Sequence, residues 1–423
     1  MIMAGVASVD ITPPAGLSLA GFAARTQSAQ GVHDALTARA IVVEDTAIVV
    51  LDVIGLHEDM AARIRKRSGL DENRIIVAAT HTHGAPVSMQ GRLGRDADPG
   101  FLQQMEDGAV KAIRRAWEGR RPASLSAGMG SDPGVAWNRR HADGPLDHAV
   151  PVIRIRDAEG SCFAVMTSYA CHPVVLAADN LLMTADYPYY VRRCLEEAYP
   201  GAVALFLTGC AGDANTGHTA QASWTLAANA QRTFATAERL GVRIAEAALV
   251  APEGDFAGPV DAGHRDLDLE MLRLETESLS QLAEQWRLEA ASAELVRATL
   301  LGHWIEWAER FEAVVPGSWR GRVSLLDWCG IPIVAMPGEI FSETGLFVRA
   351  CCNGLPAFVL AYAEGNPGYI PPSSEYQFGG YEVTEAHRFI GMPGAFAPGS
   401  AEALAEAACG LIKQRHLTAQ PVA

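Results

Sequence analysis

Residues 74–86 place two histidines directly after a short apolar run. The run at 75–79 is rich in β-branched and small apolar residues, which predicts a buried strand. The segment that follows, Thr-His-Thr-His-Gly-Ala-Pro, contains turn residues, so the strand must end in a loop. Because alternate residues of an extended chain point the same way, we expect His81 and His83 to face one pocket. Paired imidazoles are typical of metal or proton-transfer sites, although a lone His-x-His pattern also occurs on exposed surfaces.

The composition is that of a globular protein with an acidic surface. The chain has 423 residues, of which 49% are hydrophobic and 20% are charged, and its net charge is −15. Such a surface repels phosphate backbones, so we predict no nucleic-acid partner. No apolar run approaches the roughly 20 residues that cross a bilayer, and the first residues do not resemble a secretory signal. We therefore expect one domain over residues 1–423, no integral membrane segment and a cytoplasmic location.

Eight cysteines are present, and their spacing matches neither a C-x-x-C motif nor a disulfide framework. Most of them have apolar neighbours in the sequence. This pattern predicts buried, reduced thiols, as in cytoplasmic proteins. The cysteines stand at positions 162, 171, 194, 210, 329, 351, 352 and 409.

Strand-like and helix-like segments alternate along the chain, which predicts an α/β fold. We expect a mixed sheet with helices on both faces and a helical excursion at about 262–320, packed on the main body. A long loop at 364–381 carries three tyrosines and is therefore a candidate functional loop. Predicted hairpins pair 36–43 with 46–53 and 152–156 with 162–171; predicted helices cover 57–68, 99–118, 187–198, 233–249, 342–351 and 401–413.

Four predicted strands each end in a loop that carries a possible ligand. Sites in α/β proteins form outside the carboxyl ends of strands, so these side chains are candidates for one site. Two histidines and a carboxylate are also a common catalytic zinc set that leaves a position open for water. The strand at 75–79 leads to His81 and His83, that at 163–171 to His172, that at 331–336 to Glu339, and that at 357–362 to Tyr369 and Tyr381.

Several motifs together resemble the neutral ceramidase family, over nearly the whole of its catalytic domain. Thr80–Pro86 resembles the family's H-T-H-S-G-P, and Cys171-His172-Pro173 is similar to its V-H-P. The family's N-terminal pattern is resembled by Val9-Asp10-Ile11-Thr12-Pro13-Pro14 with Gly31-Val32-His33-Asp34. Its N-R-S is resembled by Asn138-Arg139-Arg140. Its tyrosine motifs, G-Y-V-T-T-P-E-E-Y and Y-E-G, are resembled by Gly368-Tyr369-Ile370-Pro371-Pro372 with Glu375-Tyr376 and by Tyr381-Glu382.

The resemblance implies a zinc site and a set of residues that act on the substrate. It implies that Zn²⁺ is bound by His81, His172, Glu339 and Tyr369, and that the substrate is acted on by His83, Arg139 and Tyr381. The implied chemistry is coherent, because zinc lowers the pKa of bound water and polarises a carbonyl. Arg139 and Tyr381 would stabilise the oxyanion. His83 would carry the proton to the leaving nitrogen.

Two departures from the family pattern shape the expected function. The family's G-D-V-S-P-N is replaced by Gly-Asp-Ala-Asn-Thr-Gly at 212–217, so no serine nucleophile is predicted. The sequence also shows no counterpart of the family's C-terminal immunoglobulin-like domain or secretion signal. We therefore expect zinc-dependent hydrolysis of a linear amide in a small molecule, an N-acyl compound smaller or more soluble than ceramide. The alternatives are an ester, lactone or sugar derivative as substrate, or a metal-dependent binding protein without turnover; a homo-oligomer is possible in each case.

A few polar residues keep two interpretations. Asp186 is either a helix N-cap or a carboxylate that orients a ligand histidine. Residues 209–217 lack the Lys-Ser/Thr of a phosphate-binding loop, so we expect them to shape the floor of the site. The helix around Trp304 and Trp307 is a packing face or a wall of the substrate pocket. No role is predicted beyond solvation or hydrogen bonding for His141, His148 and His218.

Overall fold

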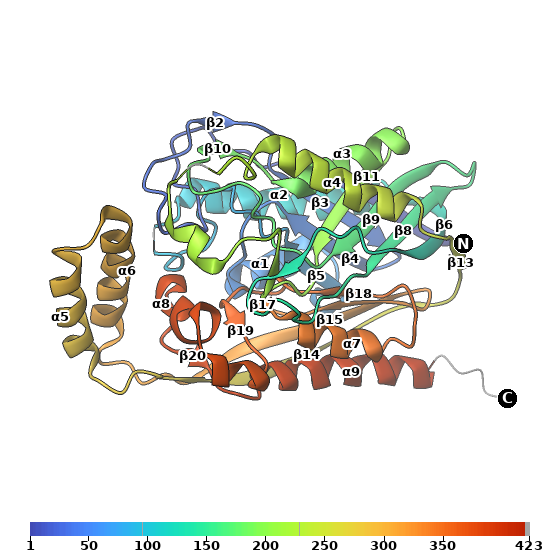
Figure 1. Ribbon diagram of the computed structural model, residues 1–423. Helices are drawn as coiled ribbons and strands as arrows, with labels where there is room; N and C mark the ends of the chain where they lie inside the picture. The colour runs from blue at the N-terminus through green and yellow to red at the C-terminus, as the bar shows by residue number, and fades with distance from the viewer. Residues whose placement is uncertain (95, 228, 419–423) are drawn as a thin grey trace.

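The structure is a computed structural model that describes residues 1–94, 96–227 and 229–418, and it stacks two β-sheets between two layers of helices (Figure 1). The larger sheet is mixed and has the order β11-β9-β8-β6-β1-β3-β4-β5, with β13 also paired to β6. Both predicted hairpins are confirmed, as β3–β4 and β8–β9. The strands are β1 (Ile2–Asp10), β3 (Thr37–Val43), β4 (Thr46–Leu51), β5 (Ile75–Ala79), β6 (Arg121–Gly130), β8 (Val150–Asp157), β9 (Cys162–Tyr169), β11 (Val203–Thr208) and β13 (Gly254–Phe256).

Helices α1 to α4 cover one face of the large sheet (Figure 1). The helix α2 illustrates why the sequence folds this way. Asp98 caps it by accepting a hydrogen bond from the amide of Phe101 at 2.8 Å. Its apolar stripe, including Met105 and Ile113, packs on strand residues such as Val49. The helices are α1 (Glu58–Ser68), α2 (Pro99–Glu118), α3 (Tyr187–Ala198) and α4 (Phe234–Leu249).

The α/β class with a mixed sheet and flanking helices is confirmed, but the second face of the large sheet packs on the second sheet instead of on helices. Ile41 and Ile76 of the large sheet share a buried cluster with Trp328 and Ile333 of the smaller one. Helices α7 (Ser342–Ala350) and α9 (Ser400–Thr418) then cover the outer face of the second sheet. That sheet has the order β18-β16-β15-β14-β20, with β14 (Val260–Leu272), β15 (Ser318–Trp328), β16 (Ile331–Ala335), β18 (Phe358–Leu360) and β20 (Ala395–Phe396).

The predicted helical excursion at 262–320 is shorter than expected. Its ends belong to the long antiparallel pair β14–β15, and only α5 (Leu279–Ala290) and α6 (Leu295–Phe311) are helical. The stretch Asp-Leu-Asp-Leu-Glu-Met at 266–271 alternates charged with apolar residues, which is the period of a strand with one wet face. Trp304 and Trp307 are buried, and Trp304 packs edge-on against Trp286, so the packing interpretation is confirmed.

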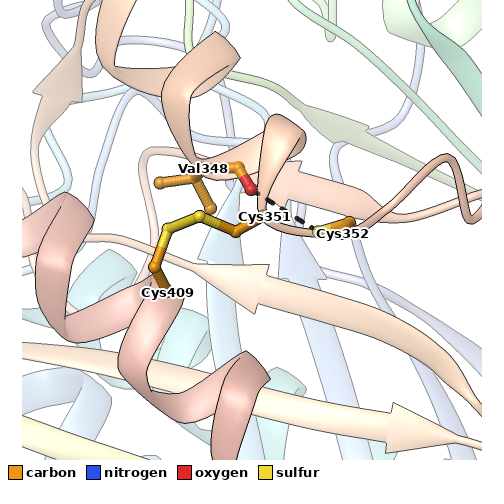
Figure 2. Close-up of a disulfide and its surroundings, with 4 residues drawn as sticks. All are labelled: Val348, Cys351, Cys352 and Cys409. Carbon is orange, nitrogen blue, oxygen red and sulfur yellow. Dashed lines mark hydrogen bonds between the residues drawn. A yellow bond between two sulfur atoms is a disulfide. The ribbon is translucent and has the colours of Figure 1, made fainter. Parts of the chain in front are cut away.

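A disulfide joins the end of α7 to α9 through Cys351 and Cys409 (Figure 2). The prediction of reduced thiols is therefore wrong for this pair. Because 58 positions separate the two cysteines, only the packing of α7 against α9 brings them together, and no spacing rule could reveal it. Disulfides are typical of oxidising compartments, and the cytoplasmic location stays a prediction. The remaining cysteines are free: 162, 171, 194, 210, 329 and 352.

Several short elements complete the described part of the chain. No helix in that part is long and apolar enough to span a membrane. Two-residue strands form three small pairs: β2 (Gly31–Val32) with β10 (Leu182–Met183), β7 (Trp137–Asn138) with β12 (Ala214–Asn215), and β17 (Glu339–Ile340) with β19 (Tyr369–Ile370). Four single turns and a short helix also occur: residues Glu72–Arg74, Ala220–Trp224, Ser373–Phe378 and Tyr381–Glu385, and α8 (Ala386–Ile390).

Candidate metal centre and pocket

His81 and His172 follow the ends of β5 and β9, and their rings are held by backbone carbonyls. The Nδ1 atom of His81 lies 2.6 Å from the carbonyl oxygen of Ile54, and that of His172 lies 2.5 Å from the carbonyl oxygen of Ala211. A carbonyl can only accept, so each Nδ1 carries the proton. Each Nε2 is then left with a free lone pair, which is how metal-binding histidines are usually oriented.

Glu339 meets both of these lone pairs. Its Oε2 lies 3.2 Å from Nε2 of His172 and 3.4 Å from Nε2 of His81, and all three side chains are buried. Burial lowers the pKa of His172 to about 4, so its ring is neutral at pH 7. Three acceptor atoms thus converge with no proton between them, an arrangement that fits a divalent cation.

His83 lies beside this group, and the geometry allows a second ligand set. Its Nε2 is 3.5 Å from Nε2 of His81, and single ring nitrogens of His81, His83 and His172 all lie within 4.8 Å of one another. Burial lowers the pKa of His83 well below its usual value, so the ring is neutral at pH 7. Gly21 makes room for this ring, since a Cβ there would lie 2.2 Å from Nδ1 of His83. His83 is therefore placed either as a ligand or as a base beside the metal.

Arg139 and Tyr369 form the next layer of the site. The parallel pair β17–β19 sets Tyr369 opposite Glu339. The Nη2 atom of Arg139 donates to the Tyr369 hydroxyl and to the carbonyl of Gly212, each at 2.9 Å. The Tyr369 ring lies nearly parallel to that of His172, with 6.4 Å between centroids. The structure thus brings Tyr369 next to the histidines, with its oxygen held by Arg139.

Tyr381 stands at the start of a single π-helical turn, beside Tyr369. The two tyrosine rings are 5.9 Å apart and inclined at 71°. Burial raises the pKa of both hydroxyls above the usual value, so both are protonated at neutral pH and are able to donate hydrogen bonds. Trp224 also packs edge-on against Tyr381, with 5.7 Å between the ring centroids.

One pocket joins these groups. Its polar wall includes His83, Arg139, Tyr369 and Tyr381, and its apolar wall includes Trp224, Leu300 and Phe389. Leu300 belongs to α6, so the helical excursion contributes a wall of this pocket as well as a packing face. The further lining residues are Gly21, Ala23, Val174, Asn215, His218, Thr219, Ala220 and Arg232.

Tyr362 is part of the site and has no counterpart among the predicted residues. Its ring stacks on that of His81 with 4.0 Å between centroids, and its hydroxyl lies 3.3 Å from Nδ1 of His172. In sequence it is an ordinary tyrosine at the end of an apolar strand. The only unusual feature is a backbone φ of +55°, which no sequence pattern reveals.

The polar residues with two interpretations are now placed. Asp186 is the N-cap of α3 and accepts hydrogen bonds from the amides of Tyr187 at 2.6 Å and Leu176 at 3.0 Å, so the capping interpretation is confirmed. Residues 209–217 supply the carbonyls that hold His172 and Arg139, which confirms them as a floor of the site. Three histidines had no predicted role beyond solvation or hydrogen bonding. Of these, His141 pairs with Glu375 and His148 pairs with Asp132, whereas His218 lines the pocket.

Comparison with known proteins places the chain in a family. Residues 2–224 match the family described as "Neutral/alkaline non-lysosomal ceramidase, N-terminal". The neutral ceramidase of Drosophila melanogaster is 29% identical over 225 residues, covering 46% of this chain and 32% of that protein. The neutral ceramidase of Pseudomonas aeruginosa is 27% identical over 241 residues, covering 49% of this chain and 36% of that protein.

The matched region thus spans about a third of the length of these relatives. The crystal structure of the Pseudomonas aeruginosa enzyme has the same fold, with a TM-score of 0.74 at 18% identity, over 98% of this chain and 75% of the other. Half of the sequence matches the family, and nearly all of the chain shares its fold. This chain belongs to the neutral/alkaline non-lysosomal ceramidase family.

Proposed function

We propose that this chain is a metal-dependent hydrolase that cleaves a linear amide in a small N-acyl compound, with Zn²⁺ as the metal. The observation that carries the proposal is the convergence of two histidine lone pairs and one carboxylate oxygen with no proton between them. Nitrogen and oxygen ligands of this kind are typical of catalytic zinc. The amide is proposed because the relatives are named ceramidases, and ceramide is an amide.

His81, His172 and Glu339 would hold the metal, with Tyr369 as the proposed fourth ligand. A bound zinc ion lowers the pKa of its water and polarises a carbonyl. Arg139 and Tyr381 line the pocket as hydrogen-bond donors, so they are suited to stabilise negative charge on the carbonyl oxygen. His83 is neutral and lies in the pocket wall, so its ring is able to accept a proton and return it to the leaving nitrogen.

The pocket supports a substrate with one apolar and one polar part. Trp224, Leu300 and Phe389 offer apolar contacts, whereas Asn215 and Thr219 offer hydrogen-bonding groups. Pockets with a few polar groups on an apolar wall are typical of small-molecule sites. A compound smaller or more soluble than ceramide is therefore proposed. The oligomeric state stays a prediction.

Elemental analysis of the purified protein tests the proposal. We expect about one zinc per chain in the wild type and almost none in His172→Ala, because that ligand is lost. His148→Ala is the matched control, since His148 is 54% exposed and pairs with Asp132 instead of with a candidate ligand. Wild-type protein without stoichiometric metal, purified without chelator, would contradict the proposal.

The loaded enzyme is then screened with short N-acyl amides, esters, lactones and acylated sugars. Turnover of the amides supports the proposed function. Turnover restricted to the esters, lactones or sugars would replace the amide by that class at the same centre. Tight ligand binding without any turnover would instead identify a metal-dependent binding protein.

A further inference from the structure

Glu382 lies between two neighbouring arginines in the interior. Its Oε1 is 2.8 Å from Nε of Arg139, and its Oε2 is 2.7 Å from Nη1 of Arg140. The three side chains are 4 to 8% exposed. Burial opposes ionisation of Glu382, but the two guanidinium groups outweigh it and lower the pKa of its carboxyl. A charged carboxylate thus links the 137–141 segment to the turn that begins at Tyr381.

The two arginines differ in what else holds them. Arg140 has a second carboxylate, because its Nε lies 2.7 Å from Glu375, and its Nη2 donates to the carbonyl of Gly379. Arg139 has Glu382 as its only carboxylate partner among the described ion pairs. Loss of Glu382 would therefore leave Arg140 anchored and Arg139 without its one charge partner.

The nitrogens of Arg139 divide between structure and pocket. Nε forms an ion pair with Glu382 without a hydrogen bond between them, and Nη2 donates to Gly212 and Tyr369. No hydrogen bond from Nη1 to the described residues is recorded, and Arg139 lines the pocket. The two hydrogen bonds of Nη2 and the charge of Glu382 beside Nε together hold the plane of the guanidinium, because the group is rigid. The direction of Nη1 is then set as well.

We propose that Glu382 is a positioning residue that orients Arg139, so that its Nη1 faces an oxygen of the substrate while its Nη2 holds the Tyr369 hydroxyl. Glu382 also follows Tyr381 directly, so one carboxylate sets the position of both proposed donors. The inference rests on the proposed function, since it assigns Arg139 to an anionic oxygen. Orienting a donor in advance matters because a misplaced hydrogen bond contributes little to the transition state.

The test compares Glu382→Gln with Glu375→Gln, which removes a carboxylate from Arg140 but none from Arg139. The probe is hexanoate, a short carboxylate of the kind that amide hydrolysis releases. Its Kd for metal-loaded protein is measured by calorimetry, and zinc content is measured in parallel.

For Glu382→Gln we expect about tenfold weaker hexanoate binding, a fall in kcat of about 10- to 100-fold with little change in KM, and full zinc content. For Glu375→Gln we expect hexanoate binding and kcat within about threefold of the wild type, because Glu375 pairs with Arg140 and His141 and does not line the pocket.

Glu382→Asp guards against a variant that fails to fold. It keeps the charge but withdraws the carboxylate by one bond, so we expect a loss between those of the wild type and Glu382→Gln, with an unchanged melting temperature. Equal losses in Glu382→Gln and Glu375→Gln would overturn the proposal, as would wild-type behaviour of both Glu382 variants. Unmeasurable hexanoate binding by the wild type would overturn the role of Arg139 and, with it, that of Glu382.

Binding and turnover separate the two proposals. If no substrate in the screen is hydrolysed, the proposed function fails, yet the hexanoate comparison still decides whether Glu382 orients Arg139. If turnover is present and Glu382→Gln matches the wild type in both measurements, only the positioning role fails.

Discussion

The candidate metal centre and the pocket wall beside it are held in place by partly different interactions. His81 and His172 stand at strand ends and are oriented by backbone carbonyls. Arg139 and Tyr381 stand on irregular segments, and the guanidinium contacts the side-chain carboxylate of Glu382 as well as the carbonyl of Gly212. Backbone contacts at strand ends depend on the fold as a whole, whereas a side-chain ion pair is lost with one substitution. The comparison teaches that metal binding and the proposed catalysis should be separable by mutation.

The largest effect is expected at Glu339, the carboxylate of the metal centre. Glu339→Gln should weaken metal binding by more than about 100-fold, because loss of an outer partner alone costs about 10- to 100-fold. Turnover should fall with the metal. The measurement is a competition titration with a chelator. Wild-type affinity in this variant would show that His81, His83 and His172 hold the metal without the carboxylate.

His83 lies on the border between the two regions. We expect His83→Ala to keep its metal but to lose turnover by about 10²- to 10⁴-fold, the usual contribution of a general acid–base. Elemental analysis and steady-state kinetics on the best substrate of the screen measure the two effects. Loss of metal from this variant would move His83 into the metal centre and leave the proton transfer without an assigned residue.

Tyr381 belongs to the pocket wall alone. Tyr381→Phe should lower kcat by about 10²- to 10³-fold, as removal of one oxyanion donor does elsewhere. Metal content and melting temperature should not change, because no hydrogen bond joins this hydroxyl to another residue in the described part of the chain. A rise in KM with an unchanged kcat would show that Tyr381 binds the substrate without stabilising the transition state.

The smallest effect is expected at Tyr362, which contacts the candidate ligands His81 and His172. Tyr362→Phe keeps the ring stacked on His81 but removes the hydroxyl near His172. We expect metal affinity to fall by about tenfold, the lower end of the range for outer partners. Tyr376→Phe is the matched control, since its hydroxyl donates to the carbonyl of Phe396 instead. Equal affinities in both variants would remove Tyr362 from the metal centre.

Local pattern was enough for many elements of the fold. Period-two and period-3.6 signals predicted the hairpins β3–β4 and β8–β9 and the helix α2. They failed at 262–272, where charged residues on the wet face of β14 were interpreted as a helix. The second sheet was also missed, because which layer covers a sheet depends on packing between distant segments.

The candidate site was likewise predictable in part from the sequence, whereas the rest depends on contacts between distant segments. Most residues of the predicted set follow a predicted strand, whereas Arg139 lies on a segment predicted to be irregular. The structure places His83, Arg139, Tyr369 and Tyr381 around one pocket and groups His81, His172 and Glu339 beside His83. The family motifs named these residues, and the geometry now groups them. The partners that orient them were not predictable. The carbonyls of Ile54 and Ala211 carry no residue-type signal, and the register that pairs Glu339 with Tyr369 is set by non-local contacts.

The disulfide between Cys351 and Cys409 has a topological consequence for the pocket wall. It closes a covalent ring, and Tyr369, Tyr381 and Glu382 all lie within the part of the chain that the ring encloses. A single protease cut at the exposed turn around Phe378 would therefore leave both fragments tied together. Such a nicked chain would run as one species on a gel without reductant and as two after reduction. After one such cut, the covalent link between the two fragments is lost only when this disulfide is reduced.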